Sequence, residues 1–190
     1  GPAASASLER LRRVATAAAL AARQRHVARM AFAHCLPIDG AEAFQVITEG
    51  LLLATFSGDR YKSQDKAGPA PEQMTVIAPA GSDVTALERA MERGRILGES
   101  SNLARELCNE PSNILTPSVF ADRGAAIARE TGLTVEILDE DEIARLHMGL
   151  PLGVSRGSAE PPRRAARANT DTRPWLREKN SRMRLESRQG

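Results

Sequence analysis

The clearest pattern in this chain of 190 residues is a helical repeat that runs from Ala86 to about Cys108. Apolar and small residues recur there at every third or fourth position, as they do along one face of an α-helix. Within this helix Gly94 and Gly98 would each cost about 1 kcal/mol relative to Ala, so their place on that face predicts close approach of another backbone. The predicted face comprises Leu87, Met91, Gly94, Leu97, Gly98, Ser101, Ala104 and Cys108.

The ends of this helix are also readable. Thr85, followed three positions later by Glu88, has the form of a capping box at the helix start. Asn109-Glu-Pro111 ends the helix, because the residue before a proline avoids the α conformation.

Upstream, the pattern predicts two helices and two strands. An amphipathic repeat between Leu8 and Gln24 predicts a helix that covers a sheet. The remaining elements are a strand at 26–36, a helix at 42–55, an exposed loop at 64–73 and a strand at 74–78.

Downstream, helices and strands alternate. Thr116 and Pro117 predict an N-cap and a first helical residue, and Gly132 ends that helix. A strand at 133–138, a helix at 140–148 capped by Asp139, and a second strand at 150–155 follow. This alternation predicts an α/β fold with a parallel sheet in this part of the chain.

Composition narrows the class of protein. With 42% hydrophobic and only 3% aromatic residues, the core must consist of Ala, Leu, Val and Ile. A net charge of +2 does not by itself indicate a polyanionic partner. Cys35 and Cys108 lack the spacing of a disulfide scaffold or a zinc knuckle. No apolar run has the length of a membrane span and no signal pattern opens the chain, so we expect a cytoplasmic protein.

Residues 163–190 differ in character from the rest. They are rich in arginine and lack apolar periodicity, which predicts a disordered basic tail.

Several short motifs in a fixed order resemble the leucyl (cytosol) aminopeptidases. The central one is Asn109-Glu-Pro-Ser-Asn-Ile-Leu-Thr-Pro117, which follows the long helix. Leu138-Asp-Glu, Met148-Gly and Gly153-Val-Ser-Arg-Gly-Ser158 come after it, and Glu49-Gly-Leu-Leu-Leu-Ala-Thr55 and Asp59-Arg-Tyr-Lys-Ser63 come before it. Tyr61 and Lys62 also fit an amphipathic pair at a helix end. The resemblance stops at Arg163.

The resemblance implies a division of the chain into four parts. Residues 1–84 would be the remnant of an N-terminal α/β domain, 85–111 the connecting helix, 112–162 the start of a peptidase catalytic domain with a mixed or parallel sheet, and 163–190 a divergent tail. It also implies a cytoplasmic, hexameric enzyme that removes N-terminal residues from peptides with two divalent metal ions, zinc or manganese.

The family's metal-binding motifs are not intact in this sequence, so we predict no catalytic, metal-binding or cofactor-binding residue and no peptidase activity for this chain alone. Asn169-Thr-Asp171 matches the start of one such motif, but Thr172 to Trp175 replace the residues that should follow. The acidic run Asp139 to Glu142 is better explained as the start of a helix, where carboxylates complement the helix dipole. His26, His34 and His147 fall in three different elements, and His34 is expected at the surface or hydrogen-bonded.

Two alternatives to an aminopeptidase segment stay open. In the first, the chain is a non-catalytic derivative that acts in assembly or contacts nucleic acid through its tail, with Trp175 available to stack on a base. In the second, it is a shortened product without a function of its own. The tail cations are Arg163, Arg164, Arg167, Arg173, Arg177, Lys179, Arg182, Arg184 and Arg188.

Overall fold

The computed structural model describes residues 6–34, 38 and 40–167. The chain divides into two compact units, with the boundary between Glu110 and Pro111. Each unit has its own short sheet. Within the described residues, no helix is long and apolar enough to cross a membrane.

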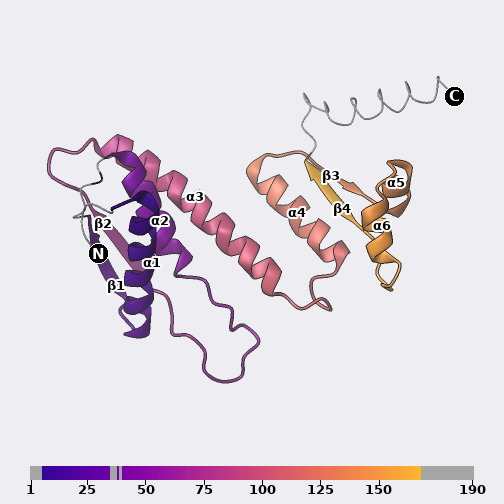
Figure 1. Cartoon of the computed structure of the whole chain (residues 1–190), viewed down its shortest axis with the longest axis horizontal. Coiled ribbons are helices and arrows are strands. Elements are labelled where there is room, and N and C mark those ends of the chain that lie inside the picture. Colours follow the sequence, from indigo (N-terminus) through magenta and orange to yellow (C-terminus); the bar gives the residue numbers. More distant parts are fainter. Residues whose placement is uncertain (1–5, 35–37, 39, 168–190) are drawn as a thin grey trace. The chain divides into compact units, whose positions relative to one another are not determined.

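The first unit is a two-stranded parallel sheet with helices packed against it (Figure 1). Strands β1 and β2 pair in register from Arg29 opposite Gln73 to Ala33 opposite Ile77. In chain order the elements are α1 (Leu8–Gln24), β1 (Arg29–Ala33), α2 (Ala41–Leu53), β2 (Gln73–Ile77) and α3 (Val84–Asn109).

The core of this unit lies between α1, α2 and one face of the sheet. Leu11 of α1 and Ile47 of α2 are among its largest fully buried side chains. Strand residues alternate in exposure, and Met30, Phe32, Met74 and Val76 pack on the core. Alanine fills much of the rest, as the scarcity of aromatic residues predicts. The buried cluster is Leu11, Ala15, Ala19, Ala43, Phe44, Val46, Ile47, Leu51 and Ala54.

Helix α3 packs against α2 through the two glycines that the sequence singled out. A Cβ atom at Gly94 would lie 2.4 Å from the Gln45 carbonyl oxygen, and one at Gly98 would lie 2.9 Å from the Leu52 Cβ. The predicted close backbone approach is therefore confirmed.

The start of α3 differs from the prediction. Its N-cap is Asp83, whose carboxylate accepts a hydrogen bond from the Ala86 amide at 3.1 Å. Thr85 lies inside the first turn, so the capping box expected from Thr85 and Glu88 is wrong. The acidic side chain two residues earlier satisfies the free amide and also suits the positive end of the helix dipole.

The predicted apolar face of α3 is correct only in its N-terminal half. Leu97 is already exposed, and beyond Gly98 the buried residue is Asn102, whereas Ser101, Ala104 and Cys108 are exposed. Asn102 Nδ2 donates to the Leu52 carbonyl oxygen at 2.7 Å. The helix faces the end of α2 here, where free carbonyl groups require a polar partner rather than an apolar one.

The described residues of the second unit, 111–167, form a two-stranded sheet and three helices. Its elements are α4 (Pro117–Thr131), β3 (Val135–Leu138), α5 (Glu140–Arg145), α6 (Gly149–Ser155) and β4 (Arg164–Arg167). The predicted start and end of α4 are confirmed, since Thr116 Oγ1 accepts from the Val119 amide and Gly132 has a φ of 69°. The fold is mixed α/β, as expected.

Two expectations for this unit are wrong. Residues 150–155 belong to helix α6, not to a strand. Pro151 is compatible with a helix start because the first amides of a helix have no partner within it. Residues 164–167 of the expected disordered tail form β4, which pairs with β3 in the antiparallel sense, so the sheet here is not parallel. Strands pair through backbone amide and carbonyl groups, so a segment rich in arginine can still form a strand.

Substitution of Gly94 by alanine tests the contact between α2 and α3. We expect G94A to reduce the free energy of unfolding by about 2–3 kcal/mol, because the added methyl group collides with backbone rather than with a flexible side chain. Urea unfolding followed by circular dichroism measures this. G153A is the matched control, since it adds the same methyl group to a helix with nothing within 4 Å. Equal unfolding midpoints for both variants would contradict the close contact.

Candidate functional site

The acidic run at Asp139 begins helix α5 and is occupied in capping it. Asp139 Oδ1 accepts a hydrogen bond from the Glu142 amide at 3.0 Å, and Glu142 Oε2 accepts one from the Asp139 amide at 3.2 Å. This reciprocal pair is a capping box, and it confirms the predicted role of Asp139. Glu142 also lies 3.8 Å from Arg145 Nη2.

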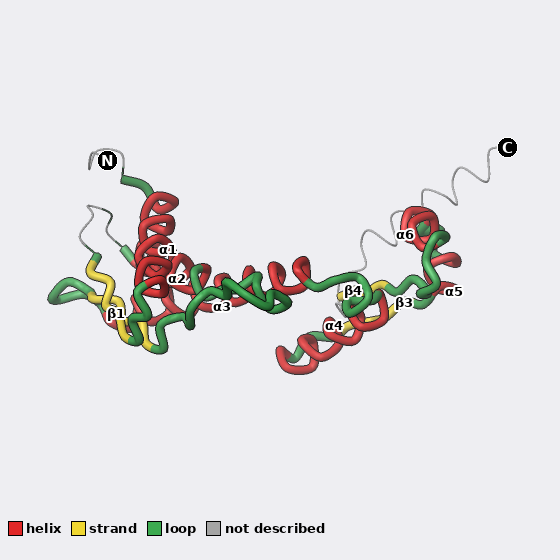
Figure 2. Tube along the Cα trace, turned by 90° about the horizontal axis from the view of Figure 1, so that it is seen from below, coloured by secondary structure: helices red, strands yellow, loops and turns green. Residues whose placement is uncertain are grey.

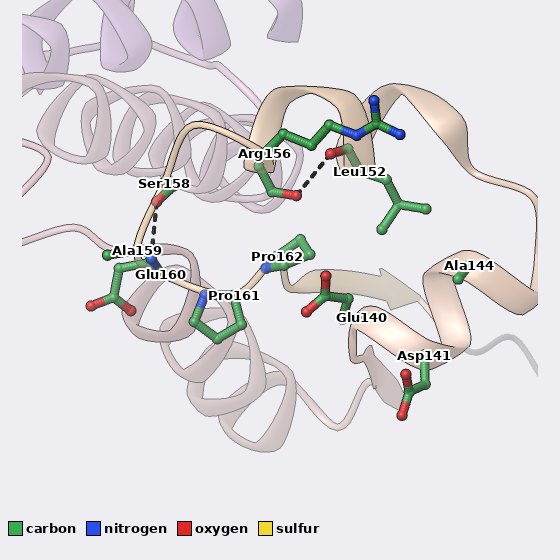
Figure 3. Close-up of a pocket in the computed structure, with 11 residues that line it drawn as sticks. Glu140, Asp141, Ala144, Leu152, Arg156, Ser158, Ala159, Glu160, Pro161 and Pro162 are labelled. Carbon is green, nitrogen blue, oxygen red and sulfur yellow. Dashed lines mark hydrogen bonds between the residues drawn. The ribbon is translucent and has the colours of Figure 1, made fainter.

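An open hollow of about 640 Å³ lies beside this helix (Figure 3). Glu140 and Asp141 of α5 lie on one side of it, Leu152 of α6 and the following residue Arg156 lie on another, and the segment that contains Pro161 and Pro162 closes it. The hydrogen bonds drawn there are local to the chain, such as that from the Glu160 amide to Ser158 Oγ at 3.0 Å. The lining therefore shows no convergent set of polar groups directed at a ligand.

The hollow does not fit a pair of divalent metal ions. Two dications a few ångströms apart need a dense cluster of carboxylates. Here Asp139 and Glu142 are engaged in the cap, which leaves the exposed neighbours Glu140 and Asp141. Across residues 6–34, 38 and 40–167, no group of three or more His, Cys, Asp or Glu could hold a metal ion.

The histidines are not brought together into one site. His26 and His147 are exposed and have positive φ values of 54° each. His34 Nε2 bonds the Ile38 carbonyl oxygen at 2.6 Å, as expected of a hydrogen-bonded histidine, and its ring meets Phe44 edge-on. The His34 Nδ1 atom is buried and has no hydrogen-bond partner among the residues that the structure describes. His147 belongs to the second unit, whereas the other two belong to the first.

Two motifs that are far apart in the sequence do meet in the first unit. Arg60 Nη1 lies 2.7 Å from Glu110 Oε1, and the Tyr61 hydroxyl donates to Glu110 Oε2. Asn109 Nδ2 donates to the Gly58 carbonyl oxygen at 3.1 Å. Tyr61 and its neighbours thus lie in a turn against the end of α3. The alternative of an amphipathic pair at a helix end is wrong, because α2 ends at Leu53.

Polar side chains on one face of α3 contact the end of α2 and the start of the loop that follows it. Arg105 Nη1 donates to the Leu53 carbonyl oxygen at 3.0 Å, and its guanidinium carbon lies 3.9 Å from the centre of the Phe56 ring. Asn102, Arg105 and Asn109 are three and four residues apart and so lie on one face of the helix. This polar spacing is a signal in the sequence that the apolar pattern alone does not detect.

From the opposite side, the buried Arg23 of α1 fixes the same loop. Its Nε donates to the Gly68 carbonyl oxygen at 2.5 Å, and its Nη1 donates to the Phe56 carbonyl oxygen at 2.8 Å. Figure 2 shows the loop after α2 as a long green segment beside α3.

The remaining sequence candidates lie outside the described residues. They are Cys35, the motif fragment Asn169-Thr-Asp171, Trp175 and the tail cations from Arg173 onward. Of the other tail cations, Arg164 and Arg167 occupy β4 and Arg163 immediately precedes it.

Comparison with known proteins identifies the relatives of this chain. The profile of the cytosol aminopeptidase family, catalytic domain, matches residues 102–169. A probable cytosol aminopeptidase from Solibacter usitatus (strain Ellin6076) is 40% identical over 152 residues, which are 80% of this chain and 31% of that protein. The chain thus spans under a third of the length of this curated relative.

Solved structures give the same result. The bottromycin maturation enzyme BotP in complex with Mn is similar with a TM-score of 0.70 and 30% identity, over 86% of this chain and 33% of that one. A variant of tomato leucine aminopeptidase has a TM-score of 0.70 and 28% identity, over 84% of this chain and 33% of that one.

The loop between α2 and β2 also contains a carboxylate, that of Asp59, whose protonation state is coupled to folding. Hydrogen bonds from the Ser57 hydroxyl and from the Ala67 amide lower the pKa of Asp59 below its ordinary value. A lowered native pKa stabilises the fold above the unfolded pKa, and this contribution is lost as the pH falls through the native pKa.

We therefore expect D59N to unfold at lower urea concentration than the native sequence at pH 7, and the difference to shrink as the pH falls below about 4. Unfolding curves at pH 7 and at more acidic pH measure this. D65N is the control, because Asp65 lies exposed in the same loop and asparagine tolerates its positive φ of 52°. A D59N deficit that is constant with pH would exclude the carboxylate as its cause.

Proposed function

We propose, since this chain belongs to the cytosol aminopeptidase family, that it forms the part of a metal-dependent leucyl-type aminopeptidase in which a connecting helix leads into the catalytic domain. The match of the catalytic-domain profile to residues 102–169 carries this proposal, because it begins within α3 and extends through the second unit.

The division of labour within the chain follows the same premise. Residues 1–84 act as the end of an N-terminal domain, 85–111 as the connecting helix, 112–162 as the start of the catalytic domain, and 163–190 as a divergent tail. The boundary between the two compact units at Glu110 and Pro111 supports a domain junction at this point.

Hydrolysis of peptides by the whole enzyme would use two divalent metal ions, zinc or manganese, to activate water and polarise the scissile carbonyl. The manganese named with BotP supports divalent metal chemistry in this family. The described residues do not fit such a pair of ions, since their densest carboxylates are used in a helix cap. We therefore propose that this chain contributes structure rather than metal ligands, and that it is inactive alone.

The partners and location follow from the family in the same way. We propose peptides with a free N-terminus as substrates of the whole enzyme, a hexamer as its assembly and the cytoplasm as its location. The relatives are named as probable cytosol aminopeptidases, which supports the peptide substrates and the location.

An activity assay with added metal tests the proposal. We expect the purified chain to release no measurable product from leucine p-nitroanilide with manganese or zinc, and its melting temperature to be unchanged by either ion. Tomato leucine aminopeptidase under the same conditions is the positive control. Turnover by this chain, abolished by a chelator, would overturn the proposed inactivity and leave the family assignment intact.

A second role in nucleic-acid contact is favoured by the arginine-rich composition of residues 163–190. If the tail neutralises phosphates, the affinity for single-stranded DNA or RNA falls steeply with salt, by about 0.7 logarithmic units per contact for each tenfold increase. Titrations of this chain and of a chain ending at residue 167 at several salt concentrations measure this. Equal affinity of both chains for nucleic acid would exclude a role of the tail in this binding.

A further inference from the structure

The contact between the Asp59–Ser63 segment and the end of α3 has an unusual distribution of burial. The Glu110 side chain is only 3% exposed, whereas that of Arg60 is 69% exposed. Arg60 and Tyr61 both bond this carboxylate, while their own side chains remain largely open to solvent. Burying a carboxylate without a partner costs free energy. The bonds to Arg60 and Tyr61 therefore favour the buried position of Glu110.

Arg60 and Tyr61 also contact each other. The guanidinium carbon of Arg60 lies 5.8 Å from the centre of the Tyr61 ring, within the range of a cation–π contact. Asn109, the residue before Glu110, adds the hydrogen bond to the Gly58 carbonyl oxygen. We call these five residues the junction clamp: Gly58, Arg60, Tyr61, Asn109 and Glu110.

Glu110 is at the same time the residue where α3 ends and the first unit stops. Its amide donates to the Glu106 carbonyl oxygen at 3.1 Å, and its own backbone is extended, with φ −71° and ψ 134°. Pro111 follows and cannot continue the helix. The backbone of Glu110 is thus the last helical hydrogen-bond donor, while its side chain bonds a loop that lies 49 residues earlier.

We propose that the junction clamp is a conformational latch that fixes the point and direction at which the chain leaves the first unit. While Glu110 is held, loop 58–61 and the last turn of α3 move as one body. A change that withdraws Arg60 or Tyr61 from Glu110 releases the loop and the junction together. The core formed by α1 and α2 is unaffected, because none of its buried residues takes part.

The latch joins two of the sequence motifs that carry the family resemblance. The segments Asp59-Arg-Tyr-Lys-Ser63 and Asn109-Glu-Pro111 are bonded to each other through Arg60, Tyr61 and Glu110. The proposal concerns folding at the junction and does not depend on peptidase activity, so the two can fail separately.

Hydrogen exchange and NMR on the full chain test the latch through E110Q, which removes the charge and keeps the shape. We expect the Lys62 and Glu110 amides, bonded to Asp59 and Glu106 respectively, to exchange about 10-fold faster in E110Q. Amides within α2 should keep their native rates. Tyr61 is the only tyrosine of the chain, so its ring resonance should shift in the same variant.

E106Q is the matched control. Glu106 is an exposed residue one helical turn earlier, and the substitution makes the same change of charge near the end of α3. We expect native exchange at Lys62 and an unshifted Tyr61 ring resonance in E106Q. Equal behaviour of E106Q and E110Q would overturn the latch, as would faster exchange throughout α1 and α2, which would indicate general destabilisation.

Y61F decides the question if E110Q does not fold. It removes only the hydroxyl group that donates to Glu110, from a side chain that is half exposed. We expect faster exchange at the Glu110 amide as well as at Lys62, although the substitution lies in the loop alone. Faster exchange confined to the loop would show that the two segments are not coupled and would overturn the proposal.

Discussion

The first unit depends on the close approach of α3 to α2. Helix α3 reaches the backbone of α2 at Gly94 and Gly98, where any side chain would collide with Gln45 or Leu52. Glycine weakens a helix, so two of them on one buried face carry a cost that the packing must offset. The resulting contact brings the second half of α3 within hydrogen-bonding distance of the segment after α2. The polar contacts made by Asn102 and Arg105 therefore depend on two residues that have no side chain.

These polar contacts determine how a long connection is kept in one conformation. The segment from Ala54 to Pro71 has no helix or strand of its own, and such loops need side-chain partners for their carbonyl groups. Arg23 of α1 donates to the Phe56 and Gly68 carbonyl oxygens, and Asn109 of α3 donates to that of Gly58. Asn102 and Arg105 of α3 bond the carbonyl groups of Leu52 and Leu53, the last two residues of α2, and so hold the start of the segment. A single guanidinium can serve several carbonyls at once because its donors point in fixed, divergent directions. The loop is thereby held between two helices without an apolar core of its own.

The sequence predicted most elements because helix caps, prolines and glycines act locally. Thr116, Gly132 and Asp139 fulfil their predicted roles, since each needs only a neighbour within four residues. The pairing of Tyr61 with Glu110 could not be predicted, because nothing in either segment specifies a partner 49 residues away. Strand β4 could not be predicted for a related reason. It forms by pairing with β3, which is distant in the sequence, and Arg164-Ala-Ala-Arg167 itself shows no apolar alternation. Helix α6 was missed because a short apolar run fits either element until its neighbours are known.

The candidate chemistry shows the same distinction between local and distant constraints. A run of four acidic residues looks like a metal site only when its local surroundings are ignored. In this run the helix start uses the carboxylates of Asp139 and Glu142, and the two between them are exposed, with no third metal-binding side chain to join them among the described residues. A site for two metal ions requires carboxylates from several elements that converge on one point, which depends on the fold and not on local density. In the described part of this chain the acidic run begins a well-capped helix, so its local density of carboxylates reflects the helix start and not a convergence of separate elements.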